Sequence, residues 1–453
     1  MNLEGKRVLV VGGGLSGRAA ASKLLKMKAE VFLTDMQPKA KLTGIEELGL
    51  NDSQLILEKE PDLAQVKPEL LVLSPGVPPT ISFIVEARRR GIPLWGEVEL
   101  ALRDSHALVI GVTGSNGKTT TTTLIGELAK GTGRDTIVAG NIGVALSGQV
   151  DYLNNRGIVV AELSSFQLEL IDRLRVNIAV MLNITPDHLD RHGTMENYIA
   201  AKARILENQT KEDLAVLNWD DDLVKGFVPA TKARIIFFSL SSELPTGICL
   251  ENDTIVLKTL EQTTKIIHRD NLLLKGNHNL QNAMAAIAVA LELGMKVNEL
   301  GTILRDFAPV KHRQEIVGKF QDILFINDSK GTNPDSSIKA LQSYQEPIVL
   351  IAGGKNKGLD MTEFMIEVRE KVKSLILVGE AAQELEEKAK ELDVKRIIRA
   401  NTFEDSVQKA IEEAQSGDVV LLSPACTSWD MFKSYEERGE LFSRLVRNHY
   451  SEP

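Results

Sequence analysis

The chain has few cysteines for its length and lacks several features that would place it outside the cytoplasm. Only Cys249 and Cys426 occur among 453 residues, so no disulfide framework is indicated and a reducing compartment is favoured. No apolar run approaches the roughly 18 residues that a membrane helix needs, and no signal segment opens the chain. The net charge of −9 disfavours a general nucleic-acid binder. We expect a cytoplasmic protein whose partners are small molecules rather than membranes or nucleic acids.

One pattern recurs along the chain: a short apolar run, a glycine- or serine-rich turn, and then a helical stretch. It is found at residues 8–11, 70–73, 109–112, 348–351, 375–378 and 419–422. Such alternation predicts an α/β fold, with parallel sheets covered by helices on both faces and ligands at the carboxyl ends of the strands.

The length predicts about two to four domains, and we expect three. The best breaks are the stretch that ends at Gly96 and the stretch around Pro309. We therefore predict domains at 1–96, 97–307 and 308–453. Residues 214–275 contain short β-branched pieces between polar turns, which predicts an antiparallel addition to the middle domain.

Residues 113–120 read Thr-Gly-Ser-Asn-Gly-Lys-Thr-Thr, between an apolar run and a helical stretch. Glycines let backbone N–H groups approach a polyphosphate, and the helix N-terminus and Lys118 add positive charge. Thr119 or Thr120 is suited to hold Mg²⁺. The general P-loop spacing fails, because Val112 stands where its first glycine is expected. We still predict a nucleotide phosphate cradle, since a simple turn has no use for Lys-Thr-Thr.

A second glycine loop, residues 12–17, satisfies G-x-G-x-x-G after an apolar run, and Asp35 ends the next run. Taken alone, the loop favours a dinucleotide-dependent oxidoreductase. It is equally suited to the diphosphate of another nucleotide, such as a uridine sugar, and a bare structural turn is the third interpretation. Residues 74–76, Ser-Pro-Gly, close another run of the same unit and would line the same crevice.

Glu162 and His188 each follow an apolar run near the cradle, at the expected ends of neighbouring strands. A carboxylate and an imidazole there can bind Mg²⁺ directly or through water. The alternatives are that Glu162 caps a helix and that His188 satisfies a loop carbonyl. Lys202 lies in a helical pattern, where most lysines are simply on the surface.

Polar residues also gather near the end of the middle domain and after the apolar runs of the third domain. Asn279 and Asn282 fall on one face of an alanine-rich helix, which suits adenine or phosphate recognition, or only capping. Arg313 is able to fork onto a phosphate. Asp328 suits ribose hydroxyls and Lys330 a phosphate, whereas Lys357 and Ser428 suit a small carboxylate. Together these groups predict a ligand pocket.

The sequence resembles the Mur ligases over its whole length. The motifs that carry the resemblance are 113–120, 197–205, 276–282, 328–333 and 423–428. The resemblance implies a Rossmann-like amino-terminal domain for a uridine diphosphate, a central ATPase domain, and a Rossmann-like carboxy-terminal domain that closes with the amino acid. The last two motifs and the amino-terminal glycine loop favour the member that adds D-glutamate to UDP-N-acetylmuramoyl-L-alanine.

The resemblance also implies roles for individual residues. The UDP substrate would be bound by Gly14, Leu15, Ser16, Asp35, Ser74, Pro75, Gly76, Asn141 and His188. ATP would be bound by Gly114, Ser115, Asn116, Gly117, Lys118, Thr119, Thr120, Asn279, Asn282, Arg313, Asp328 and Lys330. D-glutamate would be bound by Thr332, Lys357, Ser428 and Tyr435, the last of which replaces the family's phenylalanine.

Two Mg²⁺ ions are implied, held by Thr119, Glu162, His188 and a carbamylated Lys202. Carbamylation needs a neutral amine, so the site must lower a lysine pKa that is normally about 10.4. Lys118, Glu162, His188 and Lys202 are the implied catalytic residues.

The implied reaction activates the L-alanine carboxylate with the γ-phosphate of ATP, and the amine of D-glutamate then displaces phosphate from the acyl phosphate. Another Mur or folylpolyglutamate-type ligase is the main alternative. A dinucleotide-dependent oxidoreductase and a nucleotide-gated switch protein are weaker alternatives. We expect a monomer.

Overall fold

All six recurrent apolar runs form strands in the computed structural model, which describes residues 2–274, 276–308 and 310–451. Pro309, at one predicted domain break, lies outside the described residues. The strands form three separate sheets of five, nine and six strands, and helices pack on them. The α/β prediction is confirmed. The domain limits 1–96, 97–307 and 308–453 stay our predicted division, and we use them to name the three parts of the chain.

The amino-terminal domain is a five-stranded parallel sheet in the order β3-β2-β1-β4-β5. Its strands are β1 (Arg7–Val11), β2 (Glu30–Asp35), β3 (Leu55–Leu57), β4 (Leu70–Leu73) and β5 (Leu94–Gly96). Its helices are α1 (Leu15–Lys26), α2 (Leu63–Val66) and α3 (Ser82–Arg89), and α4 (Glu97–Leu102) follows as the connection to the middle domain. The fully buried strands β1 and β4 explain the continuous apolar runs.

The glycine loop after β1 is shaped by close packing. A Cβ on Gly17 would lie 1.7 Å from the carbonyl oxygen of Gly12, so α1 can approach the strand only with glycine at this position. The Asp35 carboxylate accepts the N–H of Gly13 at 2.6 Å and that of Gln37 at 2.8 Å. In this structure Asp35 therefore holds the glycine loop in place.

The middle domain is built on a nine-stranded sheet in the order β14-β13-β12-β11-β10-β9-β6-β8-β7. Its first strands are β6 (Leu108–Thr113), β7 (Thr136–Gly140), β8 (Ile158–Glu162), β9 (Ile178–Met181) and β10 (Leu214–Asn218). The remaining strands are β11 (Arg234–Ser239), β12 (Gly247–Glu251), β13 (Thr254–Lys258) and β14 (Thr263–His268). The helices are α5 (Lys118–Gly131), α6 (Ser165–Leu168), α7 (Leu189–His192), α8 (Met195–Ala203), α9 (Asp222–Lys225), α10 (Asn277–Glu292) and α11 (Val297–Asp306).

Residues 214–275 differ in part from the predicted antiparallel addition. β10 pairs in parallel with both β9 and β11, and β11 pairs in parallel with β12. Only β12, β13 and β14 pair antiparallel. These strands continue the main sheet, because α10 covers them with the same apolar core that it shares with α5.

The carboxy-terminal domain is a six-stranded sheet in the order β15-β16-β20-β17-β18-β19, parallel except for the pair β15–β16. The strands are β15 (Glu315–Phe320), β16 (Ile323–Asn327), β17 (Ile348–Gly353), β18 (Val372–Val378), β19 (Ile397–Arg399) and β20 (Val419–Leu422). The helices are α12 (Pro334–Leu341), α13 (Thr362–Lys371), α14 (Ala382–Glu391), α15 (Phe403–Glu413) and α16 (Tyr435–Ser451). Separate apolar cores lie on its two faces.

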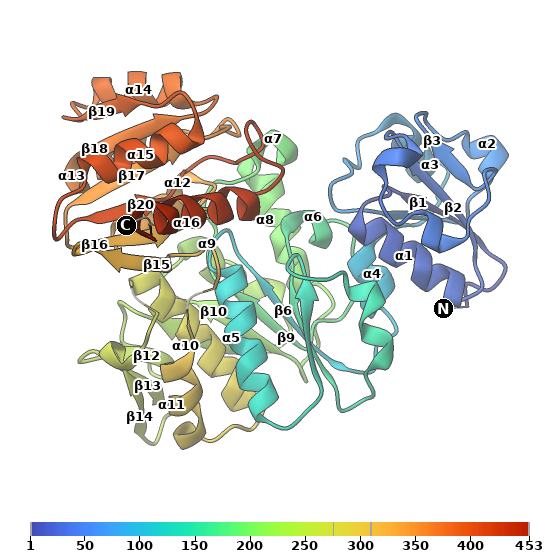
Figure 1. The fold of residues 1–453 in the computed structure, drawn as a ribbon. Coiled ribbons are helices and arrows are strands. Elements are labelled where there is room, and N and C mark those ends of the chain that lie inside the picture. The colour runs from blue at the N-terminus through green and yellow to red at the C-terminus, as the bar shows by residue number, and fades with distance from the viewer. Residues whose placement is uncertain (1, 275, 309, 452–453) are drawn as a thin grey trace.

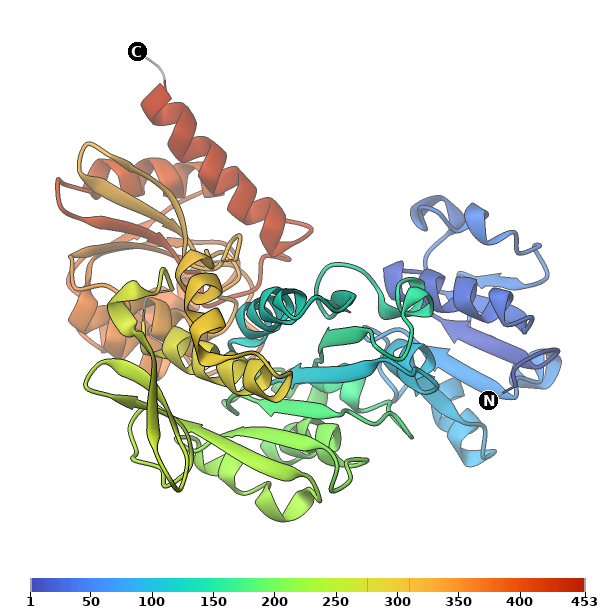
Figure 2. The ribbon, with the colours of Figure 1, turned by 90° about the horizontal axis from the view of Figure 1, so that it is seen from below.

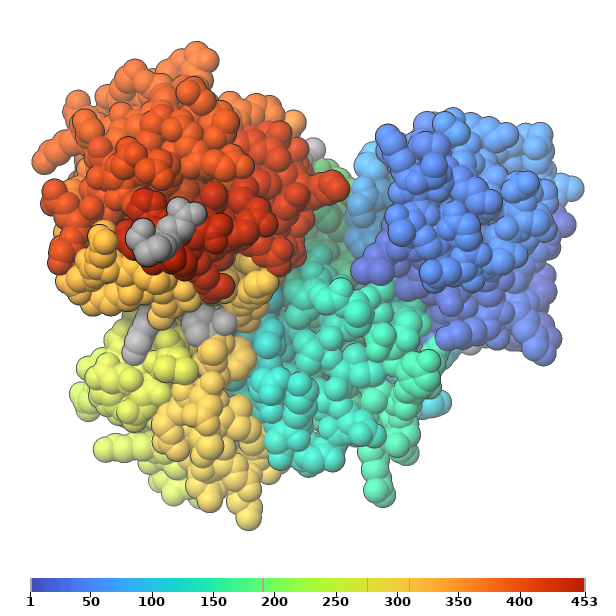
Figure 3. All heavy atoms as spheres, in the orientation of Figure 1, coloured from blue at the N-terminus to red at the C-terminus, as the bar shows by residue number. Residues whose placement is uncertain are grey.

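The middle domain lies between the other two. Figure 1 places the blue amino-terminal sheet on one side and the orange and red carboxy-terminal sheet on the other. The view from below keeps the same separation (Figure 2). In the space-filling view a hollow lies between the two outer domains, above the middle domain (Figure 3). No helix within the described residues is long and apolar enough to cross a membrane.

Candidate active site

The cradle follows β6 as predicted and leads into α5, which begins at Lys118. Gly114 and Gly117 have φ of +152° and +85°, backbone conformations that residues other than glycine rarely adopt. The Lys118 ammonium donates to the carbonyl oxygens of Gly114 and Ser115, at 2.9 and 2.7 Å. The ammonium of Lys118 therefore lies inside the loop that is predicted to bind the phosphates.

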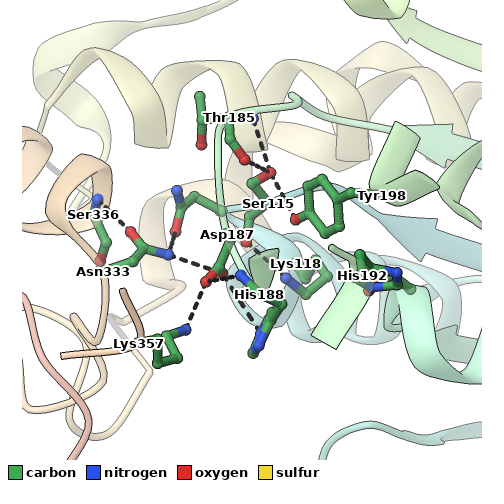
Figure 4. Close-up of polar contacts among 12 residues, drawn as sticks. Ser115, Lys118, Thr185, Asp187, His188, His192, Tyr198, Asn333, Ser336 and Lys357 are labelled. Carbon is green, nitrogen blue, oxygen red and sulfur yellow. Dashed lines mark hydrogen bonds and ion pairs between the residues drawn. The ribbon is translucent and has the colours of Figure 1, made fainter. Parts of the chain in front are cut away.

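A neighbouring loop of the middle domain, residues 183–188, braces the cradle. The N–H of Asn116 donates to the Asn183 side chain at 2.8 Å, and the Ser115 hydroxyl donates to the carbonyl of Thr185 at 2.8 Å. The same hydroxyl lies 2.9 Å from the phenol of Tyr198 on α8 (Figure 4). The cradle is therefore preorganised by protein groups alone, which lowers the cost of ordering it around a phosphate.

Lys202 is not a surface lysine. It is 1% exposed on α8 and donates at 2.7 Å to the carbonyl oxygen of Gly114, which also accepts from Lys118. Burial lowers the pKa of Lys202 well below its usual range, and Lys118 lowers it further. Burial also lowers the pKa of Lys118. Carbamylation requires a neutral amine, and the lowered pKa of Lys202 is a shift in that direction.

Glu162, at the end of β8, is 1% exposed. Its Oε1 accepts from the Asn141 side chain at 2.8 Å, and its buried Oε2 has no hydrogen-bond partner among the described residues. A buried carboxylate oxygen without a partner is costly unless a cation or donor is supplied to it. The residues present thus fit a hard cation, although no three His, Cys, Asp or Glu side chains of the described part of the chain gather as a metal centre.

The residue before His188 has a role that the sequence did not suggest. Asp187 accepts from the Lys357 ammonium at 2.6 Å and from the Asn333 side chain at 3.1 Å, and both donors belong to the carboxy-terminal domain. His188 Nε2 lies 3.6 Å from the same carboxylate. Although burial alone would raise the pKa of Asp187, Lys357 and His188 hold it at about 2.

Three predicted ATP-binding residues from two domains meet in one cavity. Thr120, Asn279 and Arg313 line a pocket of about 240 Å³ together with Tyr344. Asn282 lies beside it, where its amide donates to Asn279 at 3.2 Å. This pocket adjoins the cradle, so the structure brings together the residues predicted for the cradle and for the nucleotide beyond it.

Asp328 and Lys330 follow β16. The Asp328 carboxylate is buried and accepts from the Ser423 hydroxyl at 2.8 Å and from the N–H of Gln314 at 3.2 Å. Burial raises the pKa of Asp328 to about 6 and lowers the pKa of Lys330 to about 8. In this structure Asp328 holds the segment that carries Arg313, and Lys330 lines the large cleft described next.

A cleft of about 840 Å³ is lined by all three domains. Its lining includes the predicted residues Gly14, Leu15, Ser16, Ser74, Pro75, Gly76, Thr119, Asn141, Lys330 and Tyr435. It also includes Thr123, Gln167, Lys311, His312, Glu436 and Glu440, to which we assigned no role. The glycine loop, the Ser-Pro-Gly turn and the end of β7 therefore face one space, as their positions after parallel strands imply.

The predicted amino-acid residues come from different turns of the carboxy-terminal domain. Ser428 is 1% exposed, and its hydroxyl has no hydrogen-bond partner among the described residues. Lys357 reaches Asp187, and the Lys330 ammonium lies 5.1 Å from the centre of the Tyr435 ring. Within the described part of the chain, no hydrogen bond or ion pair joins Thr332 to the other three predicted residues.

These features define a three-domain α/β nucleotide-binding protein whose cradle lies between two domains. The family models of the Mur ligase middle domain and of the Mur ligase glutamate ligase domain match residues 112–290 and 312–426. The chain belongs to the Mur ligase family.

Several curated relatives match over nearly the whole chain, and each carries the name UDP-N-acetylmuramoylalanine--D-glutamate ligase. The protein from Desulfitobacterium hafniense (strain Y51) is 60% identical, with all of both chains covered. That from Pelotomaculum thermopropionicum is 47% identical, with 97% of each chain covered. That from Clostridioides difficile is 43% identical, with 99% of this chain and 100% of the relative covered.

Solved structures share the fold at lower identity. A pseudomurein peptide ligase type C from Methanothermus fervidus has a TM-score of 0.62 at 18% identity, and 98% of this chain and 100% of that one are covered. The MurF ligase from Thermotoga maritima, solved in complex with ADP, has a TM-score of 0.60 at 19% identity, with 99% and 96% covered. These likenesses agree with the three-domain fold.

Proposed function

We propose that this chain joins D-glutamate to UDP-N-acetylmuramoyl-L-alanine at the expense of ATP, a step of peptidoglycan synthesis. The observation that carries the proposal is the buried cluster at the cradle. Lys118, Lys202 and Glu162 lie where two domains meet, near a cleft of about 840 Å³ that residues of all three domains line. The curated relatives supply the substrate names.

The cluster suits the reaction because both reactants are anions. The substrate carboxylate must approach the γ-phosphate to about 3 Å, and their repulsion is strong in a site that excludes water. Lys118 is placed to move from the backbone carbonyls of the cradle onto the phosphates, and Lys330 faces the same cleft. The carboxylate then attacks phosphorus, ADP leaves, and the amine of D-glutamate displaces inorganic phosphate from the acyl phosphate.

We assign the magnesium ligands to Thr119, Glu162, His188 and carbamylated Lys202. When bound, the metal supplies positive charge against the triphosphate and the developing acyl phosphate. The support from this chain is the partnerless Glu162 Oε2 and the depressed pKa of the buried Lys202. We propose that two magnesium ions bind at this site.

Carbamylation of Lys202 is tested by labelling with ¹³C-bicarbonate. We expect a carbamate carbon signal in the NMR spectrum of the native protein that disappears in Lys202→Arg, whose guanidinium cannot be carbamylated. The signal should persist in Lys130→Arg, because Lys130 is exposed on α5. A native protein without the signal, or a signal that survives in Lys202→Arg, would contradict the assignment.

The reaction is tested by supplying ATP, magnesium and UDP-N-acetylmuramoyl-L-alanine with a panel of amino acids. Phosphate release and the mass of the product are measured together. We expect an amide product with D-glutamate and little with L-glutamate, L-alanine, D-alanine or L-lysine. Preference for another amino acid would identify a different ligase of the family, whereas phosphate release without an amide product would favour a nucleotide-driven switch.

A further inference from the structure

Asp187 is the point where the loop beside the cradle reaches the carboxy-terminal domain. Figure 4 shows its carboxylate between Lys357, Asn333 and His188. The side chains of Lys357 and Asp187 are each only 7% exposed, and their charged groups are 2.6 Å apart. Asn333, the residue before α12, gives the second oxygen a donor at 3.1 Å.

A buried ion pair is not explained by stability alone. Removing two charges from water costs several kcal/mol, and the attraction recovers this only with good geometry and additional hydrogen bonds. Here the pair joins residues that are 170 positions apart and belong to two domains. Such a pair is better explained by the conformation that it specifies. It holds Lys357 at one place where the middle and carboxy-terminal domains meet.

We propose that Asp187 is a positioning residue for the amino-acid site, and that it fixes the ammonium of Lys357 where the carboxylate of the incoming amino acid must bind. The inference rests on the proposed function, because it takes Lys357 as a ligand of that carboxylate. A free lysine side chain has many rotamers, and ordering it costs conformational entropy. Holding it in advance lowers the cost of binding a small anion.

The boundary between the middle and carboxy-terminal domains contains a second carboxylate, which serves as a matched control. Asp335, on α12, accepts from the Asn116 side chain of the cradle and from the Thr185 hydroxyl at 3.2 Å. It also pairs with Lys339 at 2.8 Å, and among the described residues no hydrogen bond or ion pair joins it to Lys357. Asp335 thus crosses the same boundary toward the phosphate side of the site.

The test compares Asp187→Asn with Asp335→Asn in steady-state kinetics. We expect Asp187→Asn to raise the KM for D-glutamate about tenfold or more, a change typical of a lost charged hydrogen bond. The KM for ATP and for the UDP substrate should stay within about threefold. Asp335→Asn should instead act mainly on the KM for ATP. Equal effects of both variants on the KM for D-glutamate would mean general loosening of the boundary and would overturn the inference.

A double-mutant cycle tests whether Asp187 acts through Lys357. If it does, Asp187→Asn combined with Lys357→Met should raise the KM for D-glutamate no further than Lys357→Met alone. Additive effects would overturn the inference. Should Asp187→Asn fail to fold, Asn333→Ser removes the amide donor to the carboxylate, keeps both charges and retains a side-chain oxygen able to cap α12. It should give a smaller rise in the same KM, and an unchanged KM would count against the inference.

The wild-type protein separates this inference from the proposed function. If the wild type forms no amide with D-glutamate, the proposed function fails whatever the variants do. If the wild type forms the amide and Asp187→Asn has a normal KM for D-glutamate, only the role of Asp187 fails.

Discussion

The two boundaries of the middle domain differ. Toward the carboxy-terminal domain, polar groups meet directly: Asp187 with Lys357 and Asn333, and the cradle residue Asn116 with Asp335. Toward the amino-terminal domain, the glycine loop faces an open cleft, and Leu15 is 58% exposed. Contacts on that side lie elsewhere, for example where Lys23 of α1 pairs with Asp151.

The difference matches what each side is proposed to bind. A nucleotide sugar is large and needs a preformed open groove. A phosphoryl transfer needs a closed, dry site, where each charge of the protein acts more strongly on the reactants. We therefore propose that the chemistry takes place at the closed boundary with the carboxy-terminal domain, and that the long substrate is recognised in the open cleft. Four variants test this division.

The largest effect is expected from Lys118→Ala at the closed boundary. Loss of a preorganised cation at the phosphates should lower turnover by about 100- to 1,000-fold, while the fold remains. Product formation and thermal unfolding are measured together. Lys130→Ala, at the other end of α5 and exposed, is the control and should keep normal turnover. Near-normal turnover of Lys118→Ala would contradict the proposal that the chemistry takes place at this boundary.

Gly17→Ala should unfold the open side selectively. The new Cβ would lie 1.7 Å from the Gly12 carbonyl oxygen, so α1 must move, at a cost of about 3 kcal/mol. Hydrogen exchange should show faster opening of the amino-terminal sheet and little change in the other two. Gly14→Ala is the control for stability, because nothing lies within 4 Å of its Cβ and its φ is −69°. Equal loss of protection in all three sheets would mean that the boundaries do not separate the domains energetically.

His278→Gln tests, through the pH dependence of stability, whether His278 is buried at the closed boundary. Burial, with Lys339 and Arg313 nearby, lowers the pKa of His278 to about 3. Below pH 6.5 the unfolded chain binds a proton that the folded chain does not, so stability falls as the pH falls from 6.5 toward 3. Between pH 8 and pH 5 the wild type should lose about 2 kcal/mol more than the variant in urea unfolding. Equal losses would mean that His278 is accessible to protons in the folded protein.

Asn141→Ala should have the smallest effect, on the open side. Asn141 lines the cleft and donates to Glu162 at 2.8 Å. Its loss should raise the KM for the UDP substrate about tenfold and leave the KM for D-glutamate nearly unchanged. Ile142 lines the same cleft and has no side-chain group that could donate to Glu162, so Ile142→Ala should change the KM less. A larger effect on D-glutamate than on the UDP substrate would contradict the division.

Much of the site was predictable because the candidate residues follow apolar runs. Strands that are buried on both faces read as continuous apolar sequence, and their carboxyl ends meet at one edge of a sheet. Gly114, Glu162 and Ser74 were located in this way. Asp187 was missed although it precedes His188, because nothing local reveals a partner 170 residues away.

Two other expectations show the same limit. Asp35 was predicted to bind the UDP substrate, and the sequence did not reveal that its carboxylate also accepts the N–H groups of Gly13 and Gln37. The parallel pairing of β10 and β11 was missed, because short β-branched segments do not reveal their partners. Pairing depends on which apolar face is covered, and here α10 covers it.

The amino-acid sequence by itself determined where the strands end, which loops carry glycine with positive φ, and which residue types gather at those ends. These properties depend on local sterics and on the burial of nearby side chains. Only the tertiary structure decided which charges meet: two lysines on the carbonyl of Gly114, a Glu162 oxygen without a partner, and Asp187 on Lys357. The physical reason is that electrostatic energies depend on distance and burial, and both are set by how the domains pack.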